Sequence, residues 1–321
     1  QFTLTDTVPG QPDARMPINY KENVLSVGGQ LIKEQGRTLH YNVLGEIALT
    51  GEDIGQFTIE GKGDLNFRLF NDTVRLDVNA YIKNEQPIFY FRHFHSKHYW
   101  WDNNDLSKIM RTRIQGKLTI DRWKTQLSAG VENIKNYTYL DNASVLATEA
   151  TETTPATYKN DVIVRQQSDN IQVFSATLKQ DFKLGILHLD NEVTYQKSSD
   201  ENVLPLPELV LYHNLYLEFA LAKKVLNIEM GADVRYFTQY YAPDYAPAIG
   251  QFYLQNPETR YKLGGYPLVN GYINLHLKRT RIFVQMYNLI QGTGEKSYFL
   301  APHYPLNPRI LKFGISWNFF D

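Results

Sequence analysis

The chain has 321 residues, with 33 Lys and Arg against 34 Asp and Glu, so its net charge is −1. A balance this close to neutral gives no overall field that would draw the chain to nucleic acid. The absence of cysteine excludes disulfides, thiolate metal sites and cysteine nucleophiles. No run approaches the roughly 18 apolar residues that a membrane helix needs.

The elements predicted in chain order are almost all strands in which large apolar residues alternate with polar ones. A weak strand is expected at residues 1–8. Clear alternation follows over residues 57–69, 74–83, 110–120 and 226–240, and it ends with Leu311 to Phe320. Successive side chains of a strand point to opposite faces, so each strand has one apolar face and one polar face. We expect about fourteen antiparallel strands.

The predicted connections alternate in length. Long ones are expected near residues 9–22, 51–54, 86–107, 141–168, 198–207, 241–265 and 291–307. Short ones are expected near residues 35–36, 71–72, 121–122, 184–185, 223–224 and 279–280. Long external loops and short periplasmic turns are typical of outer-membrane β-barrels. The 13% aromatic content suits interfacial belts in a membrane, although a tyrosine-rich soluble β protein would also carry it.

Three segments resemble one family of outer-membrane proteins. They are Tyr304-Pro-Leu-Asn-Pro308-Arg309, Tyr240-Tyr-Ala-Pro-Asp-Tyr-Ala-Pro247 with Gly250-Gln-Phe252, and the run from Arg92 to Asp102. Together they resemble the putative porin family of Bacteroidetes over residues 9–321, with motifs partly shared with TonB-dependent transporters. The resemblance implies a transmembrane antiparallel β-barrel without a plug. We expect a single domain over residues 1–321, either whole or the C-terminal part of a longer chain.

Charged residues on the wet faces are the candidate site. A basic lumen wall is predicted from Lys62, Arg68, Arg75, Lys83, Arg111, Arg113 and Lys117. An acidic wall is predicted from Asp190, Glu192, Glu218, Glu229 and Asp233. Facing walls of opposite charge would orient dipolar solutes and set ion selectivity. The alternative, which we favour for any single residue, is that these charges form cross-strand pairs that fill the interior.

Two further constellations carry less weight. His93, His95 and His98 have a spacing that could bind zinc or copper if their loop folds back. The preferred interpretation is an aromatic loop packed over the rim and anchored by Trp100 and Trp101. Ser175, His188, His276 and Asp190 fall on wet faces but form no recognisable hydrolase motif. We therefore expect no metal site, no cofactor and no enzymatic activity.

The favoured function is a porin-like channel for passive diffusion of small hydrophilic solutes or ions across the outer membrane of a Gram-negative bacterium, with the C-terminus in the periplasm. The alternative is a narrow or plugged barrel that acts as a docking subunit of an outer-membrane complex. Expected partners are membrane lipid and lipopolysaccharide, the barrel-assembly machinery through the C-terminal strand, and outer-membrane proteins or lipoproteins. No nucleic-acid partner is expected.

Overall fold

The structure is a computed structural model of the whole chain. It describes every residue except 1, 4–6, 9–10, 16–18, 70–71, 97–98, 144, 150, 154–156, 160, 294–297 and 320–321. In these described segments no helix has the length and apolar character needed to cross a membrane. The helical elements are α1 (Phe89–Arg92) and a single 3-10 turn at Asp121–Trp123.

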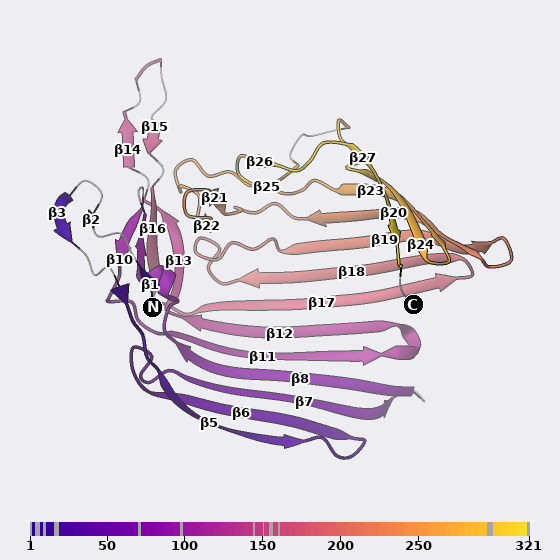
Figure 1. Cartoon of the computed structure of the whole chain (residues 1–321), viewed down its shortest axis with the longest axis horizontal. Coiled ribbons are helices and arrows are strands. Elements are labelled where there is room, and N and C mark those ends of the chain that lie inside the picture. Colours follow the sequence, from indigo (N-terminus) through magenta and orange to yellow (C-terminus); the bar gives the residue numbers. More distant parts are fainter. Residues whose placement is uncertain are drawn as a thin grey trace.

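One antiparallel sheet of thirteen strands dominates the fold (Figure 1). Each strand pairs with the next strand of the sheet along the chain, so the topology is a simple meander. In chain order the strands are β5 (Leu25–Lys33), β6 (Leu39–Thr50), β7 (Phe57–Leu69), β8 (Asp72–Glu85), β11 (Ile109–Ile120), β12 (Thr125–Lys135), β17 (Ile171–Leu184), β18 (Leu187–Ser198), β19 (Leu209–Leu221), β20 (Leu226–Phe237), β23 (Leu268–Leu277), β24 (Thr280–Tyr287) and β27 (Ile310–Trp317).

The described residues form seven further two-stranded sheets outside this main sheet. They are β1 (Phe2–Thr3) with β4 (Asn19–Tyr20), β2 (Thr7–Val8) with β3 (Gln11–Arg15), β9 (His93–His95) with β10 (Trp100–Asp102), β13 (Tyr137–Asn142) with β16 (Val162–Gln167), β14 (Val145–Thr148) with β15 (Thr157–Lys159), β21 (Asp244–Ala246) with β22 (Gln251–Tyr253), and β25 (Phe299–Ala301) with β26 (Tyr304–Pro305).

The sheet separates apolar from polar side chains, as the alternating sequence predicts. In β27 the apolar residues Phe313, Ile315 and Trp317 share one face and are 80%, 70% and 60% exposed. In β20 the polar residues Glu229, Asp233 and Arg235 share the opposite face with their cross-strand partners. An exposed apolar surface that continues over many strands is far larger than the patches that soluble monomers carry.

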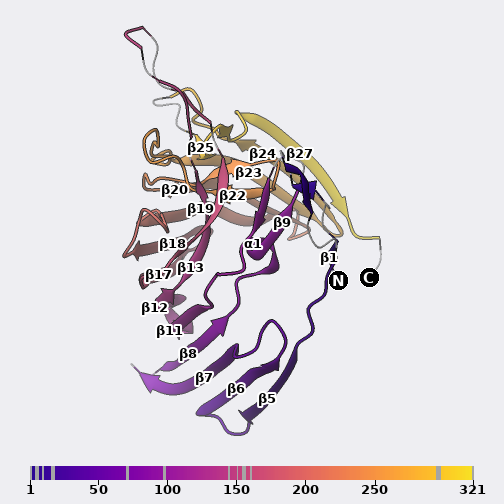
Figure 2. The same cartoon turned by 90° about the vertical axis from the view of Figure 1, so that its left-hand side faces the viewer.

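The polar face lies on the hollow side of the curved sheet. The Tyr81 hydroxyl on β8 donates to Glu132 on β12 at 3.0 Å, across the intervening strand β11. The Tyr272 hydroxyl on β23 donates to Asn214 on β19 at 3.1 Å, across β20. Side chains two strands apart approach each other only when the sheet curves toward them. Viewed from the long-loop end, the sheet forms an arc with α1, β9 and β13 inside it (Figure 2).

The arc is open in the described part of the chain. Strands β5 and β27 form the two edges of the main sheet and do not pair with each other. The prediction of a strand at residues 1–8 within this sheet is wrong, because β1 pairs with β4 outside it. The main sheet therefore has thirteen strands instead of about fourteen. Each edge presents a row of backbone N–H and C=O groups that require partners in lipid.

The predicted alternation of long and short connections is confirmed after β8, whereas the connections 34–38 and 51–56 have nearly equal lengths. Parts of the predicted connections at 9–22 and 71–72 lie outside the described residues. The short turns lie together at one end of the sheet and the long loops at the other, with the C-terminus at the short-turn end (Figure 1). The short turns use left-handed backbone at Gly185, with φ of 60°, and at Lys223 and Lys224. The described residues of the segment 141–168 form more secondary structure than a plain loop, since they include β14, β15 and all of β16.

Gly231 on β20 occupies a position where the sheet has no room for a side chain. A Cβ atom there would lie 2.4 Å from the carbonyl oxygen of Leu215 and 2.5 Å from the Cβ of Tyr216. We expect Gly231→Ala to lower the free energy of unfolding by about 1–3 kcal/mol, because strand β19 must move. Urea unfolding in lipid vesicles measures this.

The matched control for this substitution is Gly271→Ala on the neighbouring strand β23. No heavy atom lies within 4 Å of a Cβ built on Gly271. We expect this variant to unfold within about 0.5 kcal/mol of the wild type. Equal unfolding of the two variants would contradict the close approach at Gly231.

Candidate functional site

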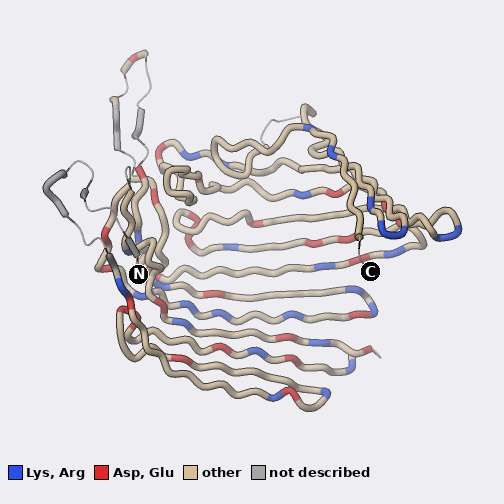
Figure 3. Tube along the Cα trace, in the orientation of Figure 1, with Lys and Arg blue, Asp and Glu red and all other residues tan. Residues whose placement is uncertain are grey.

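The predicted basic residues come together on the polar face of β7, β8 and β11. The register places all seven on the same face, where several meet acidic neighbours. The ion pairs are Lys62 with Glu60 at 2.8 Å, Arg75 with Asp77 at 2.8 Å, Lys117 with Asp77 at 3.2 Å, and Arg111 with Glu132 at 2.5 Å. Figure 3 shows these basic and acidic residues interleaved along the strands. Pairing along the sheet thus neutralises much of this basic wall.

Of the three other basic residues of this wall, Arg68 lies opposite Thr73 in the register of β7 and β8, and two have partners that are not acidic. Arg113 donates to the side chain of Gln115 at 2.8 Å. The Lys83 ammonium lies 5.1 Å from the centre of the Tyr81 ring. Among the residues that the structure describes, neither of these two cations has a carboxylate within 4.0 Å.

The predicted acidic residues also share one face, across β18, β19 and β20. Glu192 pairs with Lys179 at 2.9 Å, and Glu218 lies 3.3 Å from the ring of His188. Asp190 lies opposite Asp181 in the register of β17 and β18, and Glu229 accepts a hydrogen bond from Asn274 at 3.3 Å. Within the described residues, neither Asp190 nor Glu229 has a cation within 4.0 Å. This wall keeps a surplus of negative charge.

Loops at the long-loop end pack into an ordered unit, which we call the loop cap. It comprises α1, β9, β10, β13, β16, β21 and β22. Its buried hydrophobic residues are Trp101, Leu140, Val162, Ala246, Ile249 and Tyr253. The Trp101 ring stacks on Phe94 at 4.8 Å and meets Tyr90 edge-on at 5.6 Å. Residues from three loops therefore share one hydrophobic cluster, and the predicted role of Trp101 as an anchor is confirmed.

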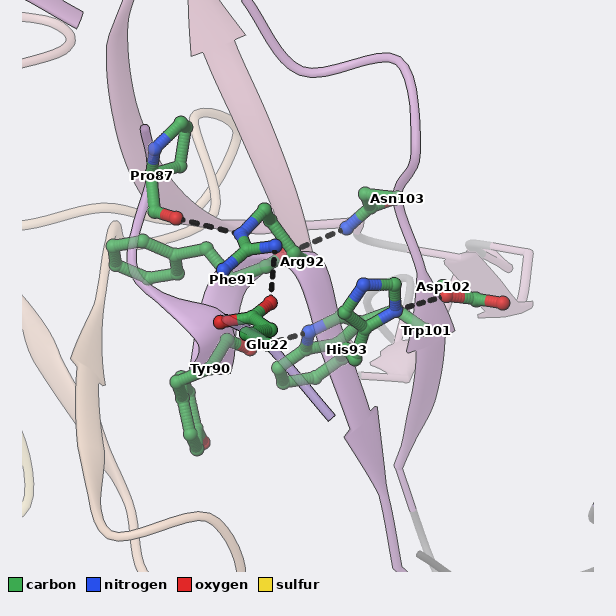
Figure 4. A network of polar contacts seen from close by, with 9 residues as sticks. All are labelled: Glu22, Pro87, Tyr90, Phe91, Arg92, His93, Trp101, Asp102 and Asn103. Atoms are coloured by element: carbon green, nitrogen blue, oxygen red, sulfur yellow. Dashed lines mark hydrogen bonds and ion pairs between the residues drawn. The ribbon is translucent and has the colours of Figure 1, made fainter. Parts of the chain in front are cut away.

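A buried arginine ties the loop cap to the segment that precedes β5 (Figure 4). Arg92 at the end of α1 is 6% exposed. Its Nη1 donates to Glu22 at 2.8 Å and its Nε donates to the carbonyl of Pro87 at 2.8 Å. Trp101 Nε1 donates to the carbonyl of Tyr90, and Asn103 donates to the carbonyl of Phe91. Glu22 and Arg92 are 70 residues apart in the sequence, so no local sequence pattern indicates their contact.

The histidines of this loop take structural positions. His93 is hydrogen-bonded to Asp102 across the β9–β10 hairpin, and the His95 ring stacks on Trp100 at 5.0 Å. His98 lies outside the described residues. Among the residues that are described, no group of three or more His, Asp or Glu is arranged to hold a metal ion.

The residues considered for hydrolysis are not assembled into a triad. His188 stacks on Tyr216 at 4.8 Å and contacts Glu218, whereas Ser175 lies opposite Gln196 farther along β18. His276 lies opposite Arg281 on the β23–β24 hairpin. Neither His188 nor His276 is therefore placed to act as a base toward the Ser175 hydroxyl.

Because the loop cap contains buried tyrosines, we predict that alkaline pH destabilises its folded structure. Burial raises the pKa of Tyr90 to about 12, and burial with the nearby Asp244 carboxylate raises the pKa of Tyr253. A raised pKa in the folded state means that the cap is fully stabilised below the ordinary tyrosine pKa of about 10. That stability is lost as the pH rises toward about 12. Tyrosinate absorbance and near-ultraviolet circular dichroism should therefore change together.

Tyr90→Phe is the control for this titration. It removes the ionisable hydroxyl, which donates to the carbonyl of Ile249 at 3.1 Å, and retains the ring. We expect the variant to lose part of the alkaline step. Titration of all tyrosines near their ordinary pKa, with no change in the dichroism, would contradict burial of these rings.

Comparison with known proteins gives both a family and a fold. The sequence profile of a family described as "Putative porin" matches residues 2–321. No significant match occurs among curated proteins. The structure is similar to the siderophore receptor PirA from Acinetobacter baumannii, with a TM-score of 0.59 and 10% identity over 92% of this chain and 45% of that one.

Two further solved structures have the same relation to this chain. The ferric enterobactin receptor PfeA has a TM-score of 0.59 and 15% identity, over 90% of this chain and 43% of the receptor. The copper transporter OprC has a TM-score of 0.55 and 11% identity, over 90% of this chain and 47% of the transporter. This chain thus spans less than half the length of these structures. At such identities the likeness establishes the fold alone, which is that of an outer-membrane transporter barrel.

Proposed function

Because this chain belongs to the putative porin family, we propose that it lines a water-filled path for passive diffusion of small hydrophilic solutes or ions across the outer membrane. Family membership implies a non-enzymatic transport protein, and the fold is that of an outer-membrane β-barrel.

The observation that carries the proposal is the separation of faces on one continuous sheet. Apolar residues such as Phe313 and Ile315 project from the convex face, while ion pairs and hydrogen bonds occupy the hollow face. Lipid solvates the apolar convex face, and water solvates the polar hollow face. In a membrane the backbone groups at the edges β5 and β27 require hydrogen-bond partners, which closure of the ring supplies. Short turns then lie in the periplasm, with the C-terminus beside them.

Selectivity in this proposal comes from the unneutralised charges. The surplus carboxylates Asp190 and Glu229 attract cations, whereas Arg113 and Lys83 face them from a distant part of the arc. In a narrow aqueous path such charges are screened less than in bulk water. Polar groups along the wall replace part of the hydration of a passing ion. No energy coupling is required.

Conductance in planar bilayers tests this function on protein isolated from outer membranes. We expect single-channel currents, and we expect Asp190→Asn with Glu229→Gln to lower the potassium-to-chloride permeability ratio by about twofold or more. Glu258→Gln makes the same change in a loop and should leave the ratio unaltered. Absence of current, with stoichiometric co-purification of other chains, would instead support a docking subunit.

A further inference from the structure

A pocket opens on the polar face at the long-loop end, between β19, β20, β23, β24 and β27. It has a volume of about 710 Å³, which is within the range of small-molecule sites. Residues Tyr298 to Leu300 and Leu306, before β27, form its outer wall. The pocket is separate from the charge pairs on β7, β8 and β11 and from the loop cap.

Aromatic rings dominate the lining of this pocket. Tyr212, Phe237 and Tyr287 project from the sheet, and Tyr266, Tyr298 and Phe299 come from the loops. The Tyr266 and Tyr298 rings lie 5.8 Å apart, and Tyr298 stacks on Phe299 at 5.9 Å. Such rings offer flat faces to the C–H surfaces of a ring-shaped solute, and the tyrosines add hydroxyl groups that bind polar substituents.

Two cationic side chains in the pocket lie over aromatic rings. The Arg235 guanidinium lies 5.5 Å from the centre of the Tyr212 ring, and the Lys312 ammonium lies 4.6 Å from that of Tyr287. Arg235 is 3.8 Å from Asp233, whose carboxylate also accepts a hydrogen bond from Asn270 at 3.0 Å. In the described part of the chain no carboxylate lies within 4.0 Å of Lys312.

The carboxylate that lines the pocket does not neutralise these cations. Glu192 is paired with Lys179 at 2.9 Å. The pocket therefore holds positive charge over aromatic rings, with hydrogen-bonding groups around it. This distinguishes it from the acidic wall that contains Asp190 and Glu229.

The wall of the pocket is preorganised by a buried hydrogen-bond chain. Asn288 has no exposed surface, and its backbone N–H donates to the Asn270 side chain at 3.1 Å. The Tyr266 hydroxyl donates to the Asn288 side chain at 2.5 Å, and Asn288 Nδ2 donates to the carbonyl of Asn307 at 3.2 Å. These contacts join β23, β24 and the segment before β27. A ligand therefore meets a wall that needs little ordering on binding.

We propose that this pocket binds an acidic saccharide, which makes it a selectivity site for the solute path. The inference rests on the proposed function for its role in transport, but not for binding itself. A pyranose ring would stack on the free face of Tyr212 or Tyr287. Because β23 and β24 lie between β20 and β27, separate carboxylates of an acidic oligosaccharide would accept hydrogen bonds from Arg235 and from Lys312. The Gln285 amide, which also lines the pocket, would bind ring hydroxyls. A neutral saccharide leaves Lys312 without an anion and Arg235 with only its 3.8 Å contact to Asp233, and an aromatic carboxylate leaves the amide without a hydroxyl partner.

Isothermal titration with digalacturonate tests the proposal on the detergent-solubilised protein. We expect saturable binding that weakens about tenfold or more in Arg235→Gln and in Lys312→Gln, because each removes a charge-assisted hydrogen bond. Lys223→Gln removes a cation from the short turn that joins β19 and β20 and should bind as the wild type does. Tyr287→Leu keeps an apolar side chain but removes the ring, and it should weaken binding similarly.

Two comparison ligands and one independent readout complete the test. Cellobiose should bind about tenfold or more weakly than digalacturonate, since it lacks the carboxylates. Equal binding of cellobiose, tighter binding of benzoate, or no binding of digalacturonate would each overturn the proposal. Bilayer current separates the two claims: current without digalacturonate binding refutes the pocket alone, and binding without current refutes the diffusion path alone.

Discussion

Replacing Arg92 with methionine is expected to detach the loop at residues 86–108 from the segment that precedes β5. The substitution keeps much of the side-chain volume but leaves the Glu22 carboxylate, whose side chain is 21% exposed, without its cation. It also removes the donor to the carbonyl of Pro87. Breaking a buried ion pair from one side costs about 3–5 kcal/mol. Hydrogen–deuterium exchange should therefore accelerate strongly at residues 20–24 and 86–95.

The control is Arg165→Met, which breaks the pair of Arg165 with Asp141 at 2.6 Å on the β13–β16 hairpin. The Arg165 side chain is 52% exposed, so water replaces the partner. Exposed ion pairs contribute about 0–1 kcal/mol. We expect little change in exchange from this variant. Equal effects of the two substitutions would show that Arg92 does not hold the loop in place.

Truncation of Trp101 to alanine is expected to loosen three loops at once. The indole fills the centre of the hydrophobic cluster, is 7% exposed, and contacts Tyr90 and Phe94. Replacing a buried tryptophan by alanine costs about 3–5 kcal/mol, because the cavity collapses only in part. Exchange should accelerate in residues 137–142, 162–167 and 244–253 as well as in 89–102. That wider pattern separates this variant from Arg92→Met.

Trp101→Phe is the matched control for the indole. It preserves aromatic packing and removes the Nε1 donor to the carbonyl of Tyr90, a bond of 2.8 Å. We expect a loss of about 1 kcal/mol, with faster exchange confined to residues near Tyr90. Acceleration limited to residues 89–102 in Trp101→Ala would contradict the shared cluster, since the other loops would then be stable without it.

The faces of the strands were predictable from the sequence because strand periodicity is local. The pattern of residues 226–240 places Glu229 and Asp233 together on one face, and the register with β19 and β23 agrees. The seven predicted basic residues share a face for the same reason. Which cation meets which carboxylate was not predictable, because a shift of register by two residues keeps the face and changes the partner.

The site that the sequence analysis missed is the aromatic pocket. Tyr212, Tyr287 and Lys312 lie on different strands, and each alone reads as an ordinary residue of an alternating strand. The signal that was available was the presence of aromatic and cationic residues on the polar faces of several strands near the long-loop end. Its meaning depends on the neighbouring strands and on the loop at Tyr298.

By itself, the sequence determined the strands, their two faces and the alternation of long loops with short turns, because each depends on neighbouring residues and a period of two. The tertiary structure decided that the main sheet has thirteen strands with open edges at β5 and β27. It also decided that Arg92 pairs with Glu22, 70 residues away, and that three loops join in one cap around Trp101. Such contacts depend on curvature, register and loop closure, which arise only when distant segments meet.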